Sequence, residues 1–329
     1  QPIFFSFDMS ILNSTMTILR EGQNDVPNLS WSNVAIASSF IIVNGIISML
    51  LGLKLEKSLL TSSIRCIVQL TIMGKILESI FNAKNPILVM LMTFTLIFLS
   101  SCETVYNKSD WSFSRMFPSV LLSTAFSTIF IGILGTRYAM NQQQFWLPEL
   151  FIPTIGLLLG ITAGAMAVGL STCLTKVGQQ AEQIETYLSF GASRWEAGRT
   201  VAIEAIRLAM LPSINSMSVI GLITIPGAMT GQILGGAPIM NAVRYQQIIT
   251  FMVSATTSLG VLSVVFFCIH HLIDTKHRLR PERVHKYKAN VFRDIKFLIV
   301  SAWKELFHRK SDQERKAREA DENTPLINH

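Results

Sequence analysis

Residues 147–173 read LPELFIPTIGLLLGITAGAMAVGLSTC, and this stretch decides the class of fold to which the chain belongs. Its only charged residue is Glu149, close to its start. A helix of about 20 apolar residues crosses the hydrocarbon core of a bilayer. Pro148 stands where a first helical turn would begin, a place where its missing N–H costs little. The stretch therefore predicts a membrane-spanning helix.

The same criterion, applied outward along the chain, finds six more apolar windows. They are residues 31–53, 62–81, 87–106, 117–136, 208–234 and 246–273. Several polar and charged side chains interrupt window 62–81, and Pro226 with Gly227 breaks window 208–234. The sequence predicts an all-α polytopic membrane protein with seven transmembrane helices.

Composition excludes other classes of protein. Of the 329 residues, 50% are hydrophobic and only 15% are charged, whereas soluble domains have roughly 25% charged residues. This excludes a collagen, a disordered chain and a typical nucleic-acid-binding protein. The four cysteines lie in or beside apolar windows without paired spacing, which predicts buried thiols and no disulfide or metal site.

The charges predict an orientation. Cytoplasmic loops of membrane proteins are enriched in Lys and Arg, and with seven spans 23 of the 28 basic residues fall on one side. That side is predicted to be the cytosol. Residues 1–30 then form an outside or lumenal segment, residues 31–273 a seven-span permease domain, and residues 274–329 a basic cytosolic tail.

One predicted cytosolic loop, residues 175–207, reads TKVGQQAEQIETYLSFGASRWEAGRTVAIEAIR. Ile184 and Leu188 share a helical face, and Gly191 is typical of a helix end. Glu196 three residues after Ser193 is the pattern of a capping box. We expect two short helices joined at a glycine turn. The loop is either an ordinary amphipathic interfacial segment or a docking element gripped by a cytosolic motor.

Two stretches resemble a known family. The spacing from Glu185 to Gly191 is similar to the E-A-A-x-x-x-G loop of ABC-transporter permeases, with Thr186 and Tyr187 where alanine is usual. Downstream, residues 211–260 begin LPSINSMSVIGLITIPGAMTGQILGG and continue to MNAVRYQQ. This run resembles the FetB-type permease family of bacterial iron exporters and plant aluminium-tolerance membrane proteins. The resemblance covers roughly residues 31–273.

The resemblance implies a membrane subunit of an ABC transporter whose cytosolic ATPase is a separate chain. The sequence contains no G-x-x-x-x-G-K-[ST] loop, so we expect no cofactor and no enzymatic activity on this chain, with ATP bound by the partner. The implied docking residues are Ile184, Glu185, Leu188, Gly191, Ala192, Arg194, Trp195 and Glu196. Two ATPases normally act together, which favours a homodimer.

A translocation path is expected along the broken window. Pro226 removes a backbone donor, and irregular backbone at membrane depth often lines a substrate path, although a kink used only for packing is the alternative. The expected path residues are Arg65, Gln69, Asn215, Met217, Pro226, Gly227, Met229, Thr230 and Gln232. Gly156, Gly160 and Gly164 are expected to let helices pack closely, within the subunit or across a dimer.

The two ends of the chain carry short signals. Asn13 and Asn28 lie in glycosylation sequons. Residues 290–308 have the pattern of a basic amphipathic helix that binds membrane lipids. Glu322, Leu326 and Ile327 match an acidic dileucine signal, which predicts an adaptor-complex partner. That signal favours a vacuolar or lysosomal membrane over the plasma membrane.

Other functions remain open at this point. A seven-span receptor would also have an outside N-terminus and a cytosolic tail, but residues 102–106 read CETVY in place of the receptor motif Asp-Arg-Tyr. An ATPase-free scaffold or channel with a permease fold is a further alternative. The weakly polar path does not identify the substrate, and metal homeostasis is suggested by the family resemblance alone.

Overall fold

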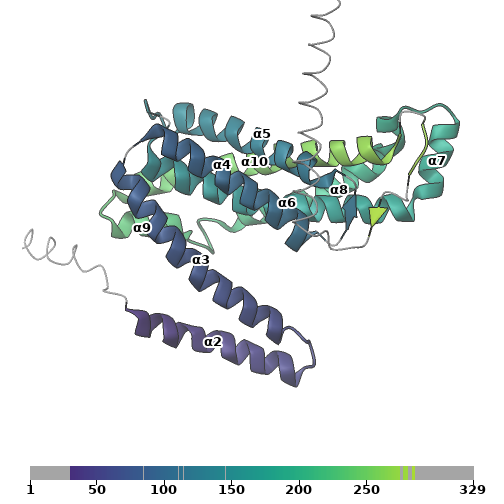
Figure 1. The fold of residues 1–329 in the computed structure, drawn as a ribbon. Helices are drawn as coiled ribbons and strands as arrows, with labels where there is room; N and C mark the ends of the chain where they lie inside the picture. The colour runs from purple at the N-terminus through teal and green to yellow at the C-terminus, as the bar shows by residue number, and fades with distance from the viewer. Residues whose placement is uncertain are drawn as a thin grey trace, which may run out of the picture. The chain divides into compact units, whose positions relative to one another are not determined.

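The computed structural model describes residues 30–83, 85–109, 111–113, 115–144, 146–274, 277–280 and 284–285. The predicted glycosylation sites, the amphipathic tail helix and the dileucine signal lie outside these residues. The chain divides into two compact units, each described here by itself (Figure 1). Unit 1 contains the described residues up to Val89 together with Trp146–Leu150 and Val219–Ile249. Unit 2 contains the rest of the described chain.

Unit 1 begins with a helical hairpin. Helix α2 (Trp31–Leu50) packs against α3 (Glu56–Ala83). Ser48 is buried at the turn between them, where its hydroxyl accepts from the Leu55 backbone N–H at 3.0 Å and donates to Glu56 at 3.2 Å. These bonds satisfy a polar side chain that would otherwise be costly to bury. The short helix α9 (Gly227–Leu234) and the first part of α10 also belong to this unit.

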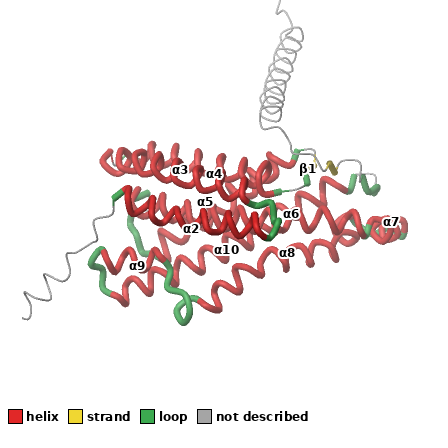
Figure 2. The backbone as a smooth tube through the Cα atoms, turned by 90° about the horizontal axis from the view of Figure 1, so that it is seen from below, coloured by secondary structure: helices red, strands yellow, loops and turns green. Residues whose placement is uncertain are grey.

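Unit 2 is a bundle of long helices (Figure 2). Its elements are α4 (Pro86–Glu103), η1 (Thr104–Lys108), α5 (Met116–Leu134), η2 (Gly135–Ala139), α6 (Pro148–Gln179), α7 (Ala181–Ser189), α8 (Arg194–Val219) and α10 (Ile239–Leu272), apart from the helix ends that belong to unit 1. Figures 1 and 2 both show α7 beyond the ends of α6 and α8.

Small residues hold the long helices of unit 2 close together. A Cβ added at Gly169 on α6 would lie 3.3 Å from Ala209 on α8 and 3.3 Å from Val261 on α10. At Gly260 on α10 it would lie 2.9 Å from Thr162 on α6. Small side chains at such crossings let backbones approach in a membrane, where lipid offers no hydrophobic drive for helix association.

Within the described residues, five helical stretches are long and apolar enough to cross a membrane. They are Trp31–Leu50, Pro86–Lys108, Met116–Ala139, Pro148–Gln179 and Ile239–Leu272. They coincide with five of the seven predicted windows, and the chain is a multi-pass membrane protein. Helix α3 covers window 62–81 but carries more polar residues than the other five. The seven-span count and the orientation stay predictions.

The predicted break in window 208–234 is present, and it is wider than the Pro226–Gly227 pair. Helix α8 ends at Val219, and Gly221 then adopts a positive φ of 96° in a turn that reaches Thr224. Pro226 caps α9, which has only 8 residues. The window is thus two helices and a non-helical link, with Pro226 at the end of the link where α9 begins.

A small β-ribbon departs from the all-helical expectation. Ser112–Phe113 (β1) pairs antiparallel with Val284–His285 (β2). After α10 the chain turns back, with the Arg280 backbone N–H donating to the Leu272 carbonyl at 3.0 Å. Leu279 is buried in the core of unit 2. The packed chain therefore extends beyond residue 273, where the sequence pattern places the start of the tail.

Candidate functional site

The candidate site is the α7 element, defined as residues 180–198, in which the chain leaves α6, turns, and enters α8. Its turn is a Schellman motif, since the Gly191 N–H donates to the Leu188 carbonyl at 3.1 Å and the Ala192 N–H donates to the Tyr187 carbonyl at 3.1 Å. Gly191 has a φ of 87°, which side chains with a Cβ rarely adopt. The predicted glycine turn and the short helix before it are confirmed, but the second helix is not short, because α8 continues for 26 residues to Val219.

The capping box at the start of α8 is also confirmed. The Ser193 backbone N–H donates to Glu196 Oε2 at 2.8 Å, and the Glu196 N–H donates to Ser193 Oγ at 3.3 Å. The Ser193 backbone N–H that donates to the carboxylate, and after it the Ser193 side chain, stabilise the charged form and lower the pKa of Glu196 below its ordinary value. At the start of α8 the backbone N–H groups of Ser193 and Glu196 are thus both hydrogen-bonded.

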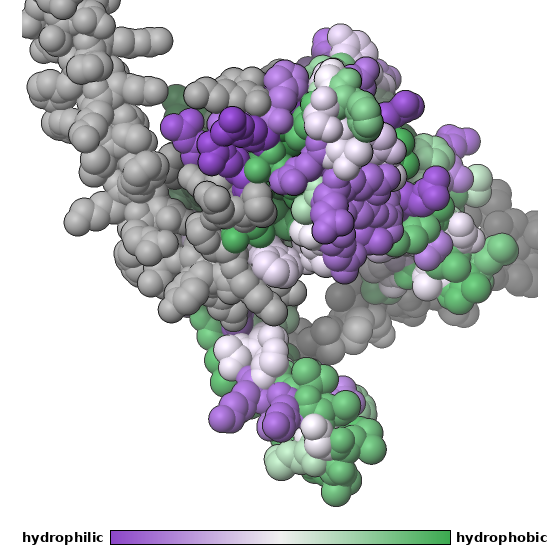
Figure 3. Space-filling view, turned by 90° about the vertical axis from the view of Figure 1, so that its right-hand side faces the viewer, coloured by the Kyte–Doolittle hydropathy of each residue, from purple (hydrophilic) through white to green (hydrophobic). Residues whose placement is uncertain are grey.

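Helix α7 turns two apolar residues inward and keeps acidic residues outside. Ile184 is 3% exposed and Leu188 is 7% exposed, and both belong to the core of unit 2. Glu182 and Glu185 are exposed. Figure 3 looks onto the end at which Figure 1 draws α7, and hydrophilic side chains gather on this face. The element is firmly seated while its outer face remains free to meet another molecule.

Phe190 is the exposed apolar tip of the α7 element. Its side chain is 86% exposed, and it stands between α7 and Gly191. The neighbouring Tyr187 is 44% exposed. Reasoning from the sequence did not select Phe190, although an aromatic residue directly before a turn glycine is a recognisable signal. Aromatic side chains that project from a polar rim are common anchors in protein interfaces.

Two predicted docking residues face the bundle. Arg194 Nη1 lies 3.3 Å from Nε2 and 3.4 Å from Nδ1 of His270. The Trp195 ring lies 5.9 Å from the Phe266 ring, centroid to centroid. Both partners are on α10. Arg194 and Trp195 thus each contact a side chain of α10, although Trp195 is itself 41% exposed.

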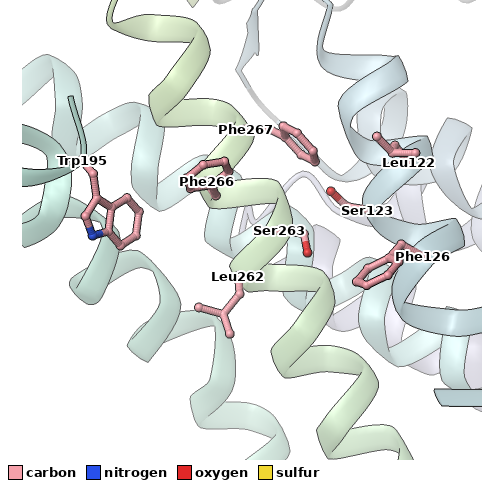
Figure 4. A pocket seen from close by; sticks show the side chains of 8 residues that line it. All are labelled: Leu122, Ser123, Phe126, Trp195, Leu262, Ser263, Phe266 and Phe267. Carbon is pink, nitrogen blue, oxygen red and sulfur yellow. The ribbon is translucent and has the colours of Figure 1, made fainter. Parts of the chain in front are cut away.

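A cavity of about 500 Å³ adjoins Trp195. It is lined by Leu122, Ser123 and Phe126 of α5, by Trp195 of α8, and by Leu262, Ser263, Phe266 and Phe267 of α10 (Figure 4). Figure 4 shows the Ser123 and Ser263 side chains in the space between α5 and α10. Ser263 donates to the Leu259 carbonyl at 2.7 Å, whereas the buried Ser123 hydroxyl has no hydrogen-bond partner among the described residues.

The predicted path residues are divided between the two units. Arg65 and Gln69 on α3 belong to unit 1, as do the path residues from Pro226 to Gln232. Asn215 and Met217 lie near the end of α8 in unit 2. None of these residues lines the cavity beside Trp195.

The glycine stripe on α6 faces no close neighbour among the described residues of the chain. A Cβ added at Gly156 or Gly160 would meet no atom within 4 Å, and one at Gly164 would meet only Lys108 Nζ, at 3.9 Å. The close approaches of α6 occur at Gly169 instead. Within the described residues, Gly156 and Gly160 are therefore not used for close packing of α6 inside the subunit.

Buried hydroxyls in the interior of unit 2 were not selected from the sequence. Thr162 and Thr257 lie with their Oγ1 atoms 3.4 Å apart, linking α6 to α10. Thr124 on α5 donates to Met166 Sδ at 3.6 Å. Single Ser and Thr residues in an apolar helix give little signal in a sequence, because they can bond to their own helix backbone. Here they link neighbouring helices.

Comparison with known proteins assigns the chain to a family. Residues 31–273 match the "Uncharacterised protein family (UPF0014)". The chain belongs to the UPF0014 family. Those residues include the whole of the α7 element and the broken window, which carried the resemblance noted in the sequence.

Several members of the UPF0014 family are similar along most of their length. The Escherichia coli "Probable iron export permease protein FetB" is 28% identical over 79% of this chain and 98% of its own length. "UPF0014 membrane protein slr1647" of Synechocystis is 30% identical over 65% of this chain and 82% of its own length. "Protein ALUMINUM SENSITIVE 3" of Arabidopsis thaliana is 25% identical over 71% of this chain and 84% of its own length. No solved structure matches significantly.

Proposed function

We propose that the chain is the membrane-spanning permease subunit of an ABC transporter, driven by a separate cytosolic ATPase. The observation that carries the proposal is the α7 element. A seated helix ends in a Schellman turn, exposes Phe190 and Glu185, and leads through a capping box into α8. A cytosolic ATPase would bind such an element as a rigid unit, because hydrogen bonds within the element hold the turn and the start of α8.

The proposed cargo is a metal ion or metal complex, moved out of the cytosol. The names of two relatives support this class, one referring to iron export and the other to aluminium sensitivity. The proposed path follows the broken window from Asn215 to Gln232, together with Arg65 and Gln69. Polar groups and interrupted helices at membrane depth often mark such a path.

The proposed assembly is a homodimer with two ATPase subunits. One chain offers one α7 element, and ATPases of this class work in pairs. The unoccupied glycine stripe on α6, described above, supports a contact between two copies. We further propose seven spans, a glycosylated lumenal N-terminus, and an adaptor-binding tail that directs the protein to a vacuolar or lysosomal membrane.

The decisive test is affinity purification of the full chain in mild detergent, followed by mass spectrometry of the proteins that co-elute. We expect a stoichiometric P-loop ATPase with the wild-type chain and its loss with Glu185→Arg. Glu149→Arg is the matched control, because it makes the same charge change at an exposed site at the other end of α6. If the wild-type chain retains no ATPase after crosslinking, the proposal is wrong.

A further inference from the structure

We propose that Arg194 and Trp195 are positioning residues that pass the motion of the α7 element to α10, and that they are not contacts for the ATPase. The inference rests on the proposed function, because the motion would come from the ATPase. It assigns α10 as the transmembrane helix that first responds. The supporting contacts all lie within unit 2.

The first link is an aromatic contact between α8 and α10. The rings of Trp195 and Phe266 have centroids 5.9 Å apart, and the rings of Phe266 and His270 are stacked with centroids 6.1 Å apart. Phe266 and His270 are four residues apart, so they share one face of α10. Arg194 reaches the same His270 ring at 3.3 Å. The adjacent residues Arg194 and Trp195 thus contact the same face of α10.

The second link is a close contact between the backbone of α8 and a side chain of α10. A Cβ added at Gly198 would lie 2.7 Å from Ile269 Cγ2. A side chain at this position would therefore require Ile269 to shift. Close-packed groups transmit strain because they cannot move independently. A tilt of the first turn of α8 must push Ile269, and with it the end of α10.

The contact continues beyond the first turn of α8. Gly169 of α6 lies against Ala209 of α8 and against Val261 and Val265 of α10. Lys176 of α6 forms an ion pair of 2.7 Å with Glu204 of α8. These contacts pack α6, α8 and α10 into one group. Helix α10 is therefore held to α8 at more places than the Trp195 contact alone.

A pocket of about 500 Å³ borders α10 and α5 near this contact. Phe266 of α10, Leu122 and Phe126 of α5, and Trp195 itself line the pocket. Below the pocket the two helices are packed, because a Cβ added at Gly260 of α10 would lie 3.2 Å from Ser127 Oγ of α5. A displacement of α10 would therefore change the distance between the pocket's two walls.

Contact with α10 separates the two roles. Phe190 is 86% exposed, whereas Trp195 is 41% exposed and its ring contacts Phe266. A residue that anchors a partner should present its side chain outward, as Phe190 does. A residue that transmits motion should touch the element that moves, as Trp195 does.

The test measures the movement of α10 in the complex of the full chain with its co-purified ATPase. Spin labels are placed at Leu122→Cys on α5 and Leu262→Cys on α10, in a background in which Cys66→Ser and Cys102→Ser remove the two cysteines that are not buried. Both labelled positions are exposed, and both line the cavity. Their distance distribution is compared without nucleotide and after trapping with ATP and vanadate. We expect a shift on trapping in the labelled parent.

Adding Trp195→Ala should abolish that shift while the ATPase remains bound in the parent's stoichiometry. Trp195→Phe, which keeps an aromatic ring against Phe266, should restore it. Phe190→Ala is the contrasting variant, and it should lose the ATPase. Should Trp195→Ala fail to yield folded protein, Phe266→Leu removes the same ring contact from the side of α10 and carries the same expectation.

Three outcomes would overturn the inference. Trp195→Ala and Phe266→Leu could keep the full shift, Trp195→Ala could lose the ATPase as Phe190→Ala does, or the parent could bind the ATPase and show no shift. The proposed function would survive each of them. Absence of any ATPase from the wild-type chain is a different result, because it removes the proposed function and the inference together.

Discussion

Ser193 and Glu196 exchange two hydrogen bonds at the start of α8, each using its backbone N–H as donor and the other's side chain as acceptor, at 2.8 Å and 3.3 Å. The pair joins the glycine turn to the helix that packs against α10. Because Glu196 is fully exposed, its contribution comes from these directed bonds and not from burial. The pair therefore has a measurable effect on how firmly the α7 element is held.

Ser193→Ala should loosen the first turn of α8. Loss of an N-cap side chain costs about 1 kcal/mol, so amide hydrogen exchange at residues 195–197 should become about fivefold faster. Hydrogen-exchange mass spectrometry in detergent measures this directly. Exchange within α5 should not change, and an equal acceleration there would indicate general destabilisation.

The same pair predicts a pH dependence. The hydrogen bonds lower the pKa of Glu196 in the folded state, so their contribution is present above the ordinary carboxyl pKa of about 4.3 and disappears as the pH falls through the lowered folded value. The protection factor of the amides at the start of α8, which is the exchange rate of an unfolded peptide at the same pH divided by the measured rate, should fall at acid pH. In Glu196→Gln this acid-dependent component should be absent.

Gly191→Ala should destabilise the turn. The positive φ of 87° at this position costs a residue with a Cβ about 1–2 kcal/mol. Gly178→Ala is the matched control, since Gly178 is an exposed helical glycine with no atom within 4 Å of an added Cβ. The control should be neutral or stabilising by about 0.5–1 kcal/mol. Gly191→Ala should therefore lower the midpoint of thermal unfolding. Gly178→Ala should leave that midpoint unchanged or raise it.

Phe190→Asp should remove the ATPase from the purified complex and leave the fold intact. The side chain is 86% exposed, so replacing it costs little in the isolated chain. Tyr138→Asp is the control, because Tyr138 is 75% exposed and lies outside the α7 element. Co-purification yields that fell equally in both variants would contradict a docking role for Phe190.

Gly198→Ala should destabilise unit 2, and Ile269→Ala should offset part of the loss. The added Cβ meets Ile269 Cγ2 at 2.7 Å, and overpacking of this kind costs about 1–3 kcal/mol. In the double variant Ile269 Cγ2 is absent. Its loss of stability should therefore be smaller, by about 0.5–3 kcal/mol, than the summed losses of the two single variants. A double-mutant cycle of unfolding midpoints measures this, and strict additivity would argue against the contact.

Gly160→Leu should separate a dimer without unfolding the chain. No described atom lies within 4 Å of an added Cβ at this position, so the chain itself has room for the side chain. If the stripe packs against a second copy, the leucine holds the two helices apart. Mass photometry should then report monomers for Gly160→Leu and dimers for wild type. An unchanged dimer would place the contact elsewhere.

Local patterns in the sequence were sufficient for the membrane class and for the α7 element. Apolar length predicts a spanning helix, because unsatisfied backbone groups are excluded from lipid. The glycine turn and the capping box were predictable for a similar reason, since Gly191, Ser193 and Glu196 interact within a few residues of one another. The broken window was predictable from Pro226.

Only the tertiary structure decided which side chains of the α7 element face outward and which face α10. Glu185 and Trp195 are both plausible docking residues in the sequence. In the structure, however, the Trp195 ring contacts Phe266, which lies 71 positions further along the chain. The close approach of Gly198 to Ile269 and the pairing of Phe113 with Val284 also join residues that are distant in sequence. Such contacts depend on how whole helices pack, and in an apolar chain many packings satisfy the same hydrophobic pattern.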